Sequence, residues 1–150
     1  MFNFFEKQSR ILYIVRGISG SGKSSLARQF VPDDCIAEAD RMPGRYGPDG
    51  KCVVSLHKEA NEWCQQQAEA LMQKGKRRIA VANTFSKRKY YQPYLDLAQK
   101  YGYTVQIVHC EGLILPDGSS PGNIHQVPDY AIVRQQENWE PFDEMLGKVQ

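Results

Sequence analysis

Short apolar runs alternate along this chain with longer stretches of helical periodicity. The apolar runs predict four strands, at residues 11–15, 35–37, 78–82 and 104–109. Between them, apolar residues recur every three or four positions and predict helices over residues 24–30, 57–74 and 86–101, with a last helix over 129–139. Strands that alternate with helices favour an α/β fold, in which helices cover both faces of a small parallel sheet of four to five strands.

Local signals refine the ends of these elements. Gly75 follows the second helix and is expected to stop it, and Ser86 is expected to cap the third. Pro93 falls in the interior of that third helix. Residues 42–51 hold three glycines and two prolines, which predicts a loop. If the strands are parallel, this loop lies beside the site at their carboxyl ends.

Composition narrows the class of protein without identifying a function. The 150 residues, 41% hydrophobic and 24% charged, suit one globular domain over 1–150. A formal net charge of +2 means that any basic surface must be local. We find no signal peptide and no run of the roughly 18–20 apolar residues that a membrane span needs. The four cysteines lack C-x-x-C spacing, so we expect reduced thiols in a cytoplasmic protein without membrane contact.

Residues 17–24 read G-I-S-G-S-G-K-S and match every position of the P-loop motif. The motif lies between a predicted strand and a predicted helix, as phosphate binding by backbone N–H groups and a helix N-terminus requires. Lys23 would reach the β- and γ-phosphates, and the Ser24 hydroxyl would join the Mg²⁺ shell. The sequence thus predicts a P-loop NTPase fold with ATP and Mg²⁺ as cofactors. The predicted phosphate-binding residues are Gly17, Ser19, Gly20, Ser21, Gly22, Lys23, Ser24 and Ser25.

Two observations narrow the kind of P-loop protein. The chain is too short for a motor or a ring-forming ATPase subunit, and it lacks the guanine-reading N-K-x-D pattern. Small P-loop kinases are left, and in these the second strand usually delivers a carboxylate. Asp40 follows the second predicted strand and could take the proton of an acceptor hydroxyl or bind the metal ion. Glu38 is the competing carboxylate; alternation along the strand would point it to the opposite side from the neighbours of Asp40, so we rank it lower.

Several separated motifs resemble the polynucleotide-kinase-like P-loop kinases, a family that includes the kinase domains of phage polynucleotide kinase and Nedd4-binding protein 2. They are G-I-S-G-S-G-K-S-S-L-A-R, the D-R at 40–41, A-N-E-W-C, N-T-F-S-K-R-K-Y-Y-Q-P-Y-L-D-L-A with K-Y-G-Y-T-V, and N-I-H-Q-V-P. Together they span about residues 11 to 140. The resemblance implies transfer of the ATP γ-phosphoryl group to a 5′-hydroxyl of RNA or DNA.

The chain lacks charged residues at positions where the family pattern has them. The tip of the third strand reads V-A-N-T and lacks the family's acidic residue, although Asn83 could still contact a phosphate or a Mg²⁺-bound water. Gly122 stands where the family has a lid arginine, and Pro43 where the polynucleotide kinase has another arginine. Phosphoryl transfer depends on charge stabilisation, so an arginine elsewhere would have to compensate. The candidates are Arg41, which we include among the predicted catalytic residues, Arg45 and Arg134.

Two basic clusters are candidate acceptor surfaces. Residues 74–78, K-G-K-R-R, follow a helix and fit a solvated helix end better than a ligand site. Residues 87–89, K-R-K, precede Tyr90, Tyr91 and Tyr94, and cations interleaved with aromatics suit the 5′-hydroxyl end of a single-stranded nucleic acid. Two alternatives stay open: a zeta-toxin-like kinase of a small molecule or nucleotide-sugar, and a nucleotide-binding regulator with weak or no catalysis. The sequence does not predict the oligomeric state.

Overall fold

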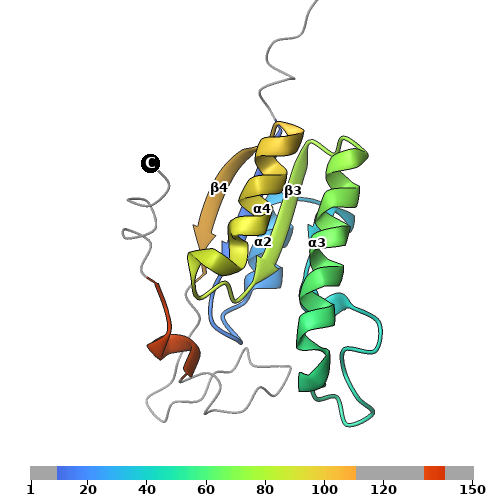
Figure 1. Cartoon of the computed structure of the whole chain (residues 1–150), viewed down its shortest axis with the longest axis vertical. Coiled ribbons are helices and arrows are strands. Elements are labelled where there is room, and N and C mark those ends of the chain that lie inside the picture. Colours follow the sequence, from blue (N-terminus) through green and yellow to red (C-terminus); the bar gives the residue numbers. More distant parts are fainter. Residues whose placement is uncertain (1–9, 111–133, 141–150) are drawn as a thin grey trace, which may run out of the picture.

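The centre of the molecule is a four-stranded parallel sheet. The computed structural model describes residues 10–110 and 134–140 of the chain. The strands are β1 (Ile11–Arg16), β2 (Ile36–Ala37), β3 (Arg78–Asn83) and β4 (Thr104–His109). They are arranged in the order β2-β3-β1-β4, with β1 paired in parallel to both β3 and β4 (Figure 1). All carboxyl ends therefore meet at one edge of the sheet.

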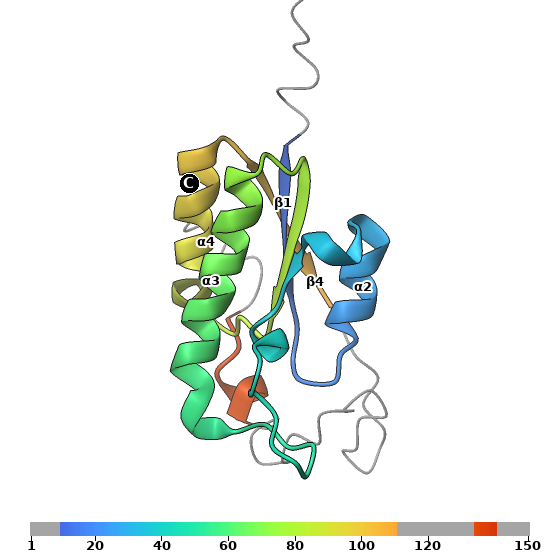
Figure 2. The same ribbon diagram turned by 90° about the vertical axis from the view of Figure 1, so that its right-hand side faces the viewer.

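Helices cover both faces of this sheet. The helix α2 (Lys23–Phe30) lies on one face, while α3 (His57–Gln73) and α4 (Arg88–Tyr101) lie on the other (Figure 2). Three short 3₁₀ turns complete the described elements: η1 (Asp33–Cys35), η2 (Ala39–Arg41) and η3 (Val54–Leu56). The predicted α/β architecture, with its parallel sheet between two helical layers, is confirmed.

Alternation along β1 explains why a strand in this sheet is apolar throughout. Leu12 and Ile14 are buried under α3 and α4, whereas Tyr13 and Val15 are buried against the α2 side. Because neither face of the strand meets water, a continuous apolar run replaces the usual alternation of polar and apolar residues. Burying these side chains stabilises the fold by about 25 cal/mol for each Å² of apolar surface removed from water.

Three details differ from the sequence prediction or extend beyond it. Cys35 belongs to η1 rather than to a strand, because the chain turns there before its pairing with β3 begins at Ile36. Ser86 does not cap α4: the N-cap is Lys87 without a side-chain cap bond, and the Ser86 carbonyl instead accepts from a buried arginine. Of the last predicted helix, residues 134–137 are helical and residues 129–133 lie outside the described part.

The described helices are not of the kind that crosses a membrane. Within residues 10–110 and 134–140, no helix combines the length and the apolar character that a bilayer span requires.

Candidate active site

The P-loop occupies the turn between β1 and α2, at the carboxyl edge of the sheet. Gly17 is closely packed there, and a Cβ at this position would clash with the Ser21 side chain and the Cys110 carbonyl. Gly22, the N-cap of α2, has a φ of 89°, which glycine adopts without strain. The close packing and the left-handed turn therefore both require glycine at these motif positions.

Lys23 begins α2 and is folded back into the loop. Its Nζ atom donates a hydrogen bond to the Ile18 carbonyl at 2.9 Å. Burial lowers the pKa of Lys23, and the negative charges of Asp40 and, more weakly, Cys110 and Glu38 oppose this shift. The ammonium group thus lies within a tight backbone loop and close enough to the carboxylates after β2 to feel their charge.

The remaining hydroxyl groups of the P-loop differ in their surroundings. The Ser21 Oγ atom is buried and has no hydrogen-bond partner among the described residues. Ser24 is partly buried in the first turn of α2, and Ser25 is exposed. An unpaired buried hydroxyl costs free energy unless a ligand satisfies it, so the loop fits an anion with several oxygen atoms.

Asp40 lies in η2, immediately after β2. Its side chain is 48% exposed, and Oδ1 lies 3.8 Å from Arg45 Nε. Burial, together with the charge of Asp40 and a hydrogen bond to it, raises the pKa of the Tyr46 hydroxyl. Because Asp40 also acts on Lys23, the structure brings the predicted base and the predicted phosphate-binding lysine to the same site.

Arg45 is the buried anchor of the loop that follows Asp40. It is 3% exposed, its Nη1 donates to the Val53 carbonyl at 2.8 Å, and its Nη2 lies 2.7 Å from His57 Nδ1. Partial burial and the charge of Arg45 lower the pKa of His57, while Asp40 acts in the opposite direction. A neutral His57 can therefore accept from Arg45, a contact that the sequence analysis did not predict.

Arg41 points back toward the start of β2. Its Nη2 lies 2.9 Å from Asp33 Oδ1 and its Nε lies 3.1 Å from Glu38 Oε2. Backbone carbonyls of Asp33 and Ile36 accept further bonds from the same guanidinium. These contacts give Arg41 a structural role, and its catalytic role stays a prediction.

Glu38 is the second carboxylate after β2, and it is more deeply buried than Asp40. The residue is 7% exposed, and its Oε1 atom has no hydrogen-bond partner among the described residues. Both carboxylates act on Lys23, Asp40 more strongly than Glu38, and their ranking as catalytic candidates stays a prediction.

Asn83, at the end of β3, connects two parts of the site. Its Oδ1 accepts from the backbone N–H of Ala39 at 3.0 Å, and its Nδ2 lies 3.5 Å from Cys64 Sγ. The first bond fixes the turn that carries Asp40. Contact of Asn83 with a phosphate or a Mg²⁺-bound water stays a prediction.

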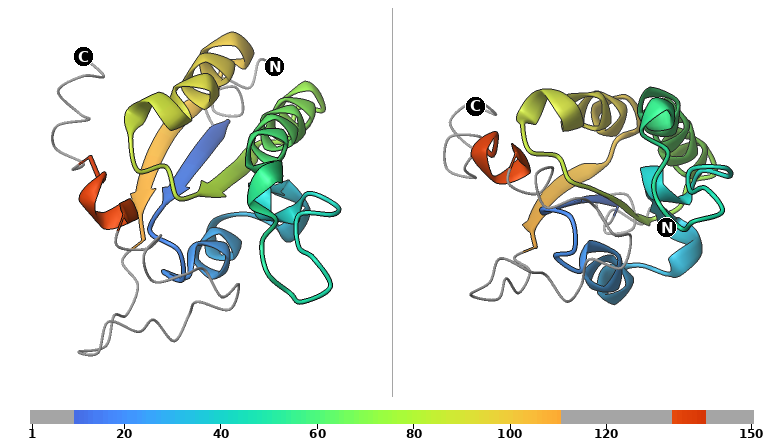
Figure 3. Two further views of the ribbon diagram at one scale, coloured as in Figure 1. Left: turned by 60° about the horizontal axis from the view of Figure 1, so that its bottom comes forward. Right: turned by 90° about the horizontal axis from the view of Figure 1, so that it is seen from below.

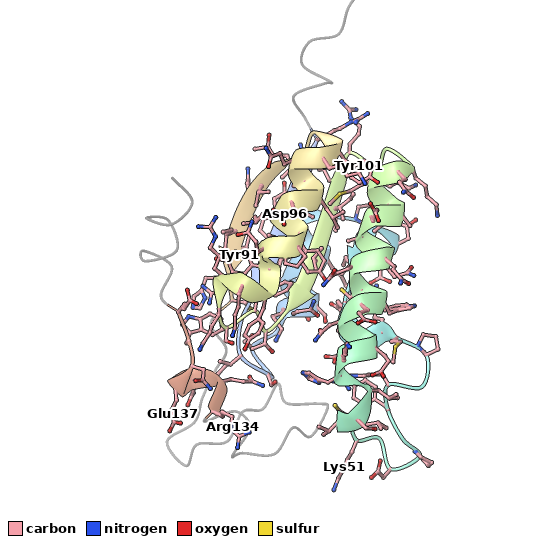
Figure 4. All side chains as sticks on the ribbon, in the orientation of Figure 1. Lys51, Tyr91, Asp96, Tyr101, Arg134 and Glu137 are labelled. Atoms are coloured by element: carbon pink, nitrogen blue, oxygen red, sulfur yellow. The ribbon has the colours of Figure 1, made fainter. Side chains whose placement is uncertain are left out.

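Residues 134–140 lie beside the P-loop, at the carboxyl edge of the sheet (Figure 3). The Ser19 backbone N–H donates to Gln135 Oε1 at 2.9 Å, and Gln135 Nε2 donates to Ser19 Oγ at 2.9 Å. Arg134 is exposed at the same end of the molecule as the loop that carries Lys51 (Figure 4). Gly122 falls outside the described residues.

A fully buried arginine holds this segment in place. Arg16 donates through Nε to the Phe85 carbonyl at 3.0 Å, and through Nη2 to the carbonyls of Ser86 at 3.2 Å and Glu140 at 3.0 Å. Burial lowers the pKa of Arg16 to about 10, and Tyr91 and Glu140 oppose the shift. Sequence reasoning missed this residue, although a cation ending an apolar strand was a visible signal.

The two basic clusters lie at opposite ends of the sheet. Residues 74–78 follow α3 at the amino end of β3, away from the P-loop (Figure 1). The 87–89 cluster lies at the start of α4, at the carboxyl edge of the sheet. Lys89 Nζ lies 5.2 Å from the centre of the Tyr90 ring, and Tyr90 is 50% exposed. Tyr91 is buried in the core, which corrects the expectation that its ring could stack on a base. Tyr94, which fits a core position better than a stacking platform, is buried there as well.

A groove runs along the first half of α4. It has a volume of about 560 Å³ and is lined by Arg88, Lys89, Gln92, Pro93, Asp96 and Glu140. Arg88 Nε donates to Gln92 Oε1 at 3.1 Å, and Gln92 Nε2 donates to Asp96 Oδ1 at 3.0 Å. The lining of the groove thus combines two cations, Arg88 and Lys89, with two carboxylates, Asp96 and Glu140.

Comparison with known proteins places the chain among P-loop proteins. A family model described as an AAA domain matches residues 12–112. Human NEDD4-binding protein 2 is 31% identical over 140 residues, which cover 88% of this chain and 8% of that protein. The chain therefore spans less than a tenth of this relative's length.

Solved structures share the fold. A gluconokinase from Sinorhizobium meliloti 1021 aligns with a TM-score of 0.53 and 17% identity, covering 89% of this chain and 77% of that one. A putative kinase from Chloroflexus aurantiacus j-10-fl aligns with a TM-score of 0.52 and 16% identity, covering 69% of this chain and 60% of that one. The AvrRxo1-ORF1:AvrRxo1-ORF2 structure with sulphate ions aligns with a TM-score of 0.56 and 16% identity, covering 83% of this chain and 45% of that one. At identities of 16–17%, these likenesses show a shared fold.

Proposed function

The chain belongs to the AAA-domain family and has a P-loop kinase-like fold, and we propose that it transfers the γ-phosphoryl group of ATP to a hydroxyl acceptor. The observation that carries this proposal is the position of Asp40, which is half exposed and close enough to the P-loop lysine for its charge to raise the pKa of Lys23 against the effect of burial. A general base must be within reach of the acceptor, and a fully buried carboxylate would not be.

The residues at the sheet edge divide the work of this reaction. The P-loop N–H groups and Lys23 hold the β- and γ-phosphates. Asp40 takes the proton of the acceptor hydroxyl, whose oxygen bonds to the γ-phosphorus as the bond to the β–γ bridging oxygen breaks. ADP is the leaving product. Asn83 keeps the turn with Asp40 in place through its bond to Ala39.

A Mg²⁺ ion fits this arrangement as the partner of the phosphates. Mg²⁺ is usually bound by one or two carboxylates together with phosphate oxygens and waters, and it supplies charge stabilisation to the reaction. The described residues contain no group of three or more side chains that could hold a metal ion alone. Ser24 and a carboxylate after β2 would therefore hold the ion together with the nucleotide.

The acceptor that we propose is the 5′-hydroxyl end of a single-stranded nucleic acid. The 87–89 cluster supports it, because these cations and the exposed Tyr90 ring lie at the same sheet edge as Asp40. Phosphate contacts from such cations give affinity without sequence preference, and an exposed aromatic ring stacks on a base.

A second candidate is a nucleotide-binding regulator with weak or no catalysis. Ala82 lies at the end of β3, where a carboxylate would add charge stabilisation, and Arg41 is already engaged by Asp33 and Glu38. Such a protein would bind ATP with Mg²⁺ and release it unchanged.

An acceptor panel separates these functions. The protein is incubated with γ-labelled ATP, Mg²⁺ and one of four acceptors: 5′-hydroxyl RNA, 5′-hydroxyl DNA, the same oligonucleotides with a 5′-phosphate, or a metabolite mixture. We expect label on the 5′-hydroxyl oligonucleotides and none on the 5′-phosphate controls. Label on a metabolite would replace the nucleic-acid acceptor with a small molecule. Binding without transfer would favour the regulator.

The Lys23→Ala variant checks that any signal comes from this site. Removing a charged hydrogen-bond donor to phosphate costs about 1.5–3 kcal/mol, or roughly 10- to 100-fold in ATP affinity. Calorimetry with ATP and Mg²⁺ measures this decrease, and Arg28→Ala, on the exposed side of the same helix, serves as the matched control. Equal ATP affinities for Lys23→Ala and wild type would show that the loop binds no phosphate.

A further inference from the structure

Glu38 is a buried carboxylate with only half of its hydrogen-bonding capacity used. Its side chain is 9% exposed, and Oε2 forms an ion pair with Arg41 Nε at 3.1 Å. Its Oε1 atom has no hydrogen-bond partner within the described part of the chain. An unsatisfied, solvent-excluded carboxylate oxygen is unfavourable, so a further ligand is needed to explain its burial.

The arginine beside Glu38 does not supply that ligand. The guanidinium of Arg41 is shared between Glu38 and Asp33, with Asp33 Oδ1 2.9 Å from Nη2. Asp33 also pairs with Arg28 at 3.0 Å, so the two carboxylates face two cations, and Arg41 reaches only the Oε2 atom of Glu38. Lys23 feels the charge of Glu38, but its ammonium donates to the Ile18 carbonyl and would turn to a bound phosphate.

The sheet register places Glu38 on the side of the sheet where the P-loop lies. Ala37 is paired with Val81, so Glu38 and Ala82 lie at the same level along their chains. Ala37 is buried under α3 and α4, whereas Ile36 is buried on the α2 side. Because side chains alternate along a strand, Glu38 is expected on the same side as Ile36, which is the side where the P-loop lies. Glu38 therefore brings a carboxylate to the level at which β3 has only Ala82.

We propose that Glu38 is the carboxylate of the Mg²⁺ site, with Oε1 bound to the ion directly or through one of its waters. The proposal rests on the proposed function, because the phosphates and Ser24 supply the other oxygens. Hard oxygen ligands with one or two carboxylates are what Mg²⁺ prefers. Asp40, which is half exposed, is then left to act as the base.

The surroundings of Glu38 make metal binding depend on nucleotide. Oε1 is excluded from solvent while Lys23 is bonded to the Ile18 carbonyl. The described residues contain no group of three or more side chains that could hold a metal ion alone, so the phosphates of a bound nucleotide would supply the missing oxygens. Calorimetry with Mg²⁺ alone should then show no binding, and Mg²⁺ binding without nucleotide would contradict the proposed order.

The test compares ATP affinity with and without the metal. Calorimetry or a fluorescent ATP analogue gives the affinity in Mg²⁺ and in EDTA for wild type and for Glu38→Gln, which keeps the shape and can still accept from Arg41. We expect Mg²⁺ to strengthen binding to the wild type. In the variant, the Mg²⁺ concentration needed for half of this increase should rise about 10- to 100-fold. In EDTA, the ATP affinity of the variant should equal or exceed that of the wild type, because the variant lacks a negative charge near the phosphates.

Two further variants separate metal binding from a structural role. Asp33→Asn removes the other carboxylate of Arg41 without changing Glu38, so its Mg²⁺ dependence should match wild type. In Glu38→Gln with Ala82→Asp, the strand register returns a carboxylate to the same level, and the Mg²⁺ dependence should recover.

Each outcome decides a separate point. Unchanged Mg²⁺ dependence in Glu38→Gln, or an equal shift in Asp33→Asn, would show that Glu38 only pairs with Arg41, and the proposal would be wrong. Equal weakening in Mg²⁺ and in EDTA would also contradict it. If wild type binds ATP no better with Mg²⁺, the metal site is wrong while nucleotide binding stands. If wild type binds no ATP in either condition, the proposed function itself is wrong.

Discussion

The guanidinium of Arg16 lies 3.8 Å from the centre of the Trp139 ring and joins the end of the first strand to residues 134–140. The same group donates to the carbonyls that begin the path from β3 to α4. One buried cation therefore fixes the P-loop strand, the loop after β3 and the segment that contacts Ser19.

Replacing Arg16 with methionine should destabilise the fold. The substitution keeps much of the volume of the side chain but leaves the carbonyls of Phe85, Ser86 and Glu140 without this donor. We expect a decrease of about 2–4 kcal/mol in the free energy of unfolding. Urea unfolding measures it, and Arg10→Met, at an exposed position, should change stability by less than about 0.5 kcal/mol. Equal stability of the two variants would contradict a structural role for Arg16.

Asp40→Asn keeps the shape of the predicted base and removes its capacity to accept a proton. Transfer should fall by roughly 10²- to 10⁴-fold, while ATP affinity changes much less, because the P-loop provides most of the binding. Initial rates with γ-labelled ATP measure the first effect and calorimetry the second.

The control for this variant is Asp49→Asn, which changes an exposed carboxylate of the same loop. Its transfer rate should stay near wild type. If Asp40→Asn weakens Mg²⁺-ATP binding as much as transfer, and excess Mg²⁺ restores both, Asp40 rather than Glu38 is the metal ligand. An undiminished rate would exclude an acceptor activated from the end of β2.

Alanine at Lys87, Arg88 and Lys89 should weaken oligonucleotide binding and flatten its salt dependence. For a single strand, removing one cation that binds a phosphate reduces the slope of log K against log salt by roughly 0.7. Fluorescence anisotropy at several salt concentrations gives the slope. The matched control is alanine at Lys74, Lys76 and Arg77, which removes as much charge at the opposite end of the sheet. Equal slopes for the two triple variants would show that the 87–89 cluster is a solvated surface and does not bind nucleic acid.

The lowered pKa of His57 predicts a pH dependence of stability. The unfolded ring takes up a proton near its ordinary pKa of about 6.5, whereas the folded ring, which is partly buried and lies beside Arg45, does so at lower pH. Stability should therefore decline as the pH falls below about 6.5, and this contribution should level off below the folded pKa. Urea midpoints at several pH values should decline less steeply for His57→Gln. Identical curves would show that the ring does not titrate as inferred.

Apolar periodicity predicted the strands and helices, and the motif at residues 17–24 predicted the P-loop, because these depend on local sequence. The same pattern that buries Leu12 and Ile14 on one face and Val15 on the other is visible in the chain itself. The contacts of Arg16 could not be predicted in this way, because its partner Glu140 lies 124 positions away. The ranking of Asp40 above Glu38 stays a prediction, because alternation gives the side of a strand and says nothing of which ligand binds there.

The packing around Arg16 also bears on where the folding unit ends. The family match stops at residue 112, and the last described strand stops at His109. A protein shortened to that boundary would keep every described strand without Gln135, Trp139 and Glu140. Arg16 would then lack the ring that covers it, and Ser19 would lack both of its bonds to Gln135. A version of this domain that ends at residue 112 is therefore expected to be less stable than one that extends through residue 140.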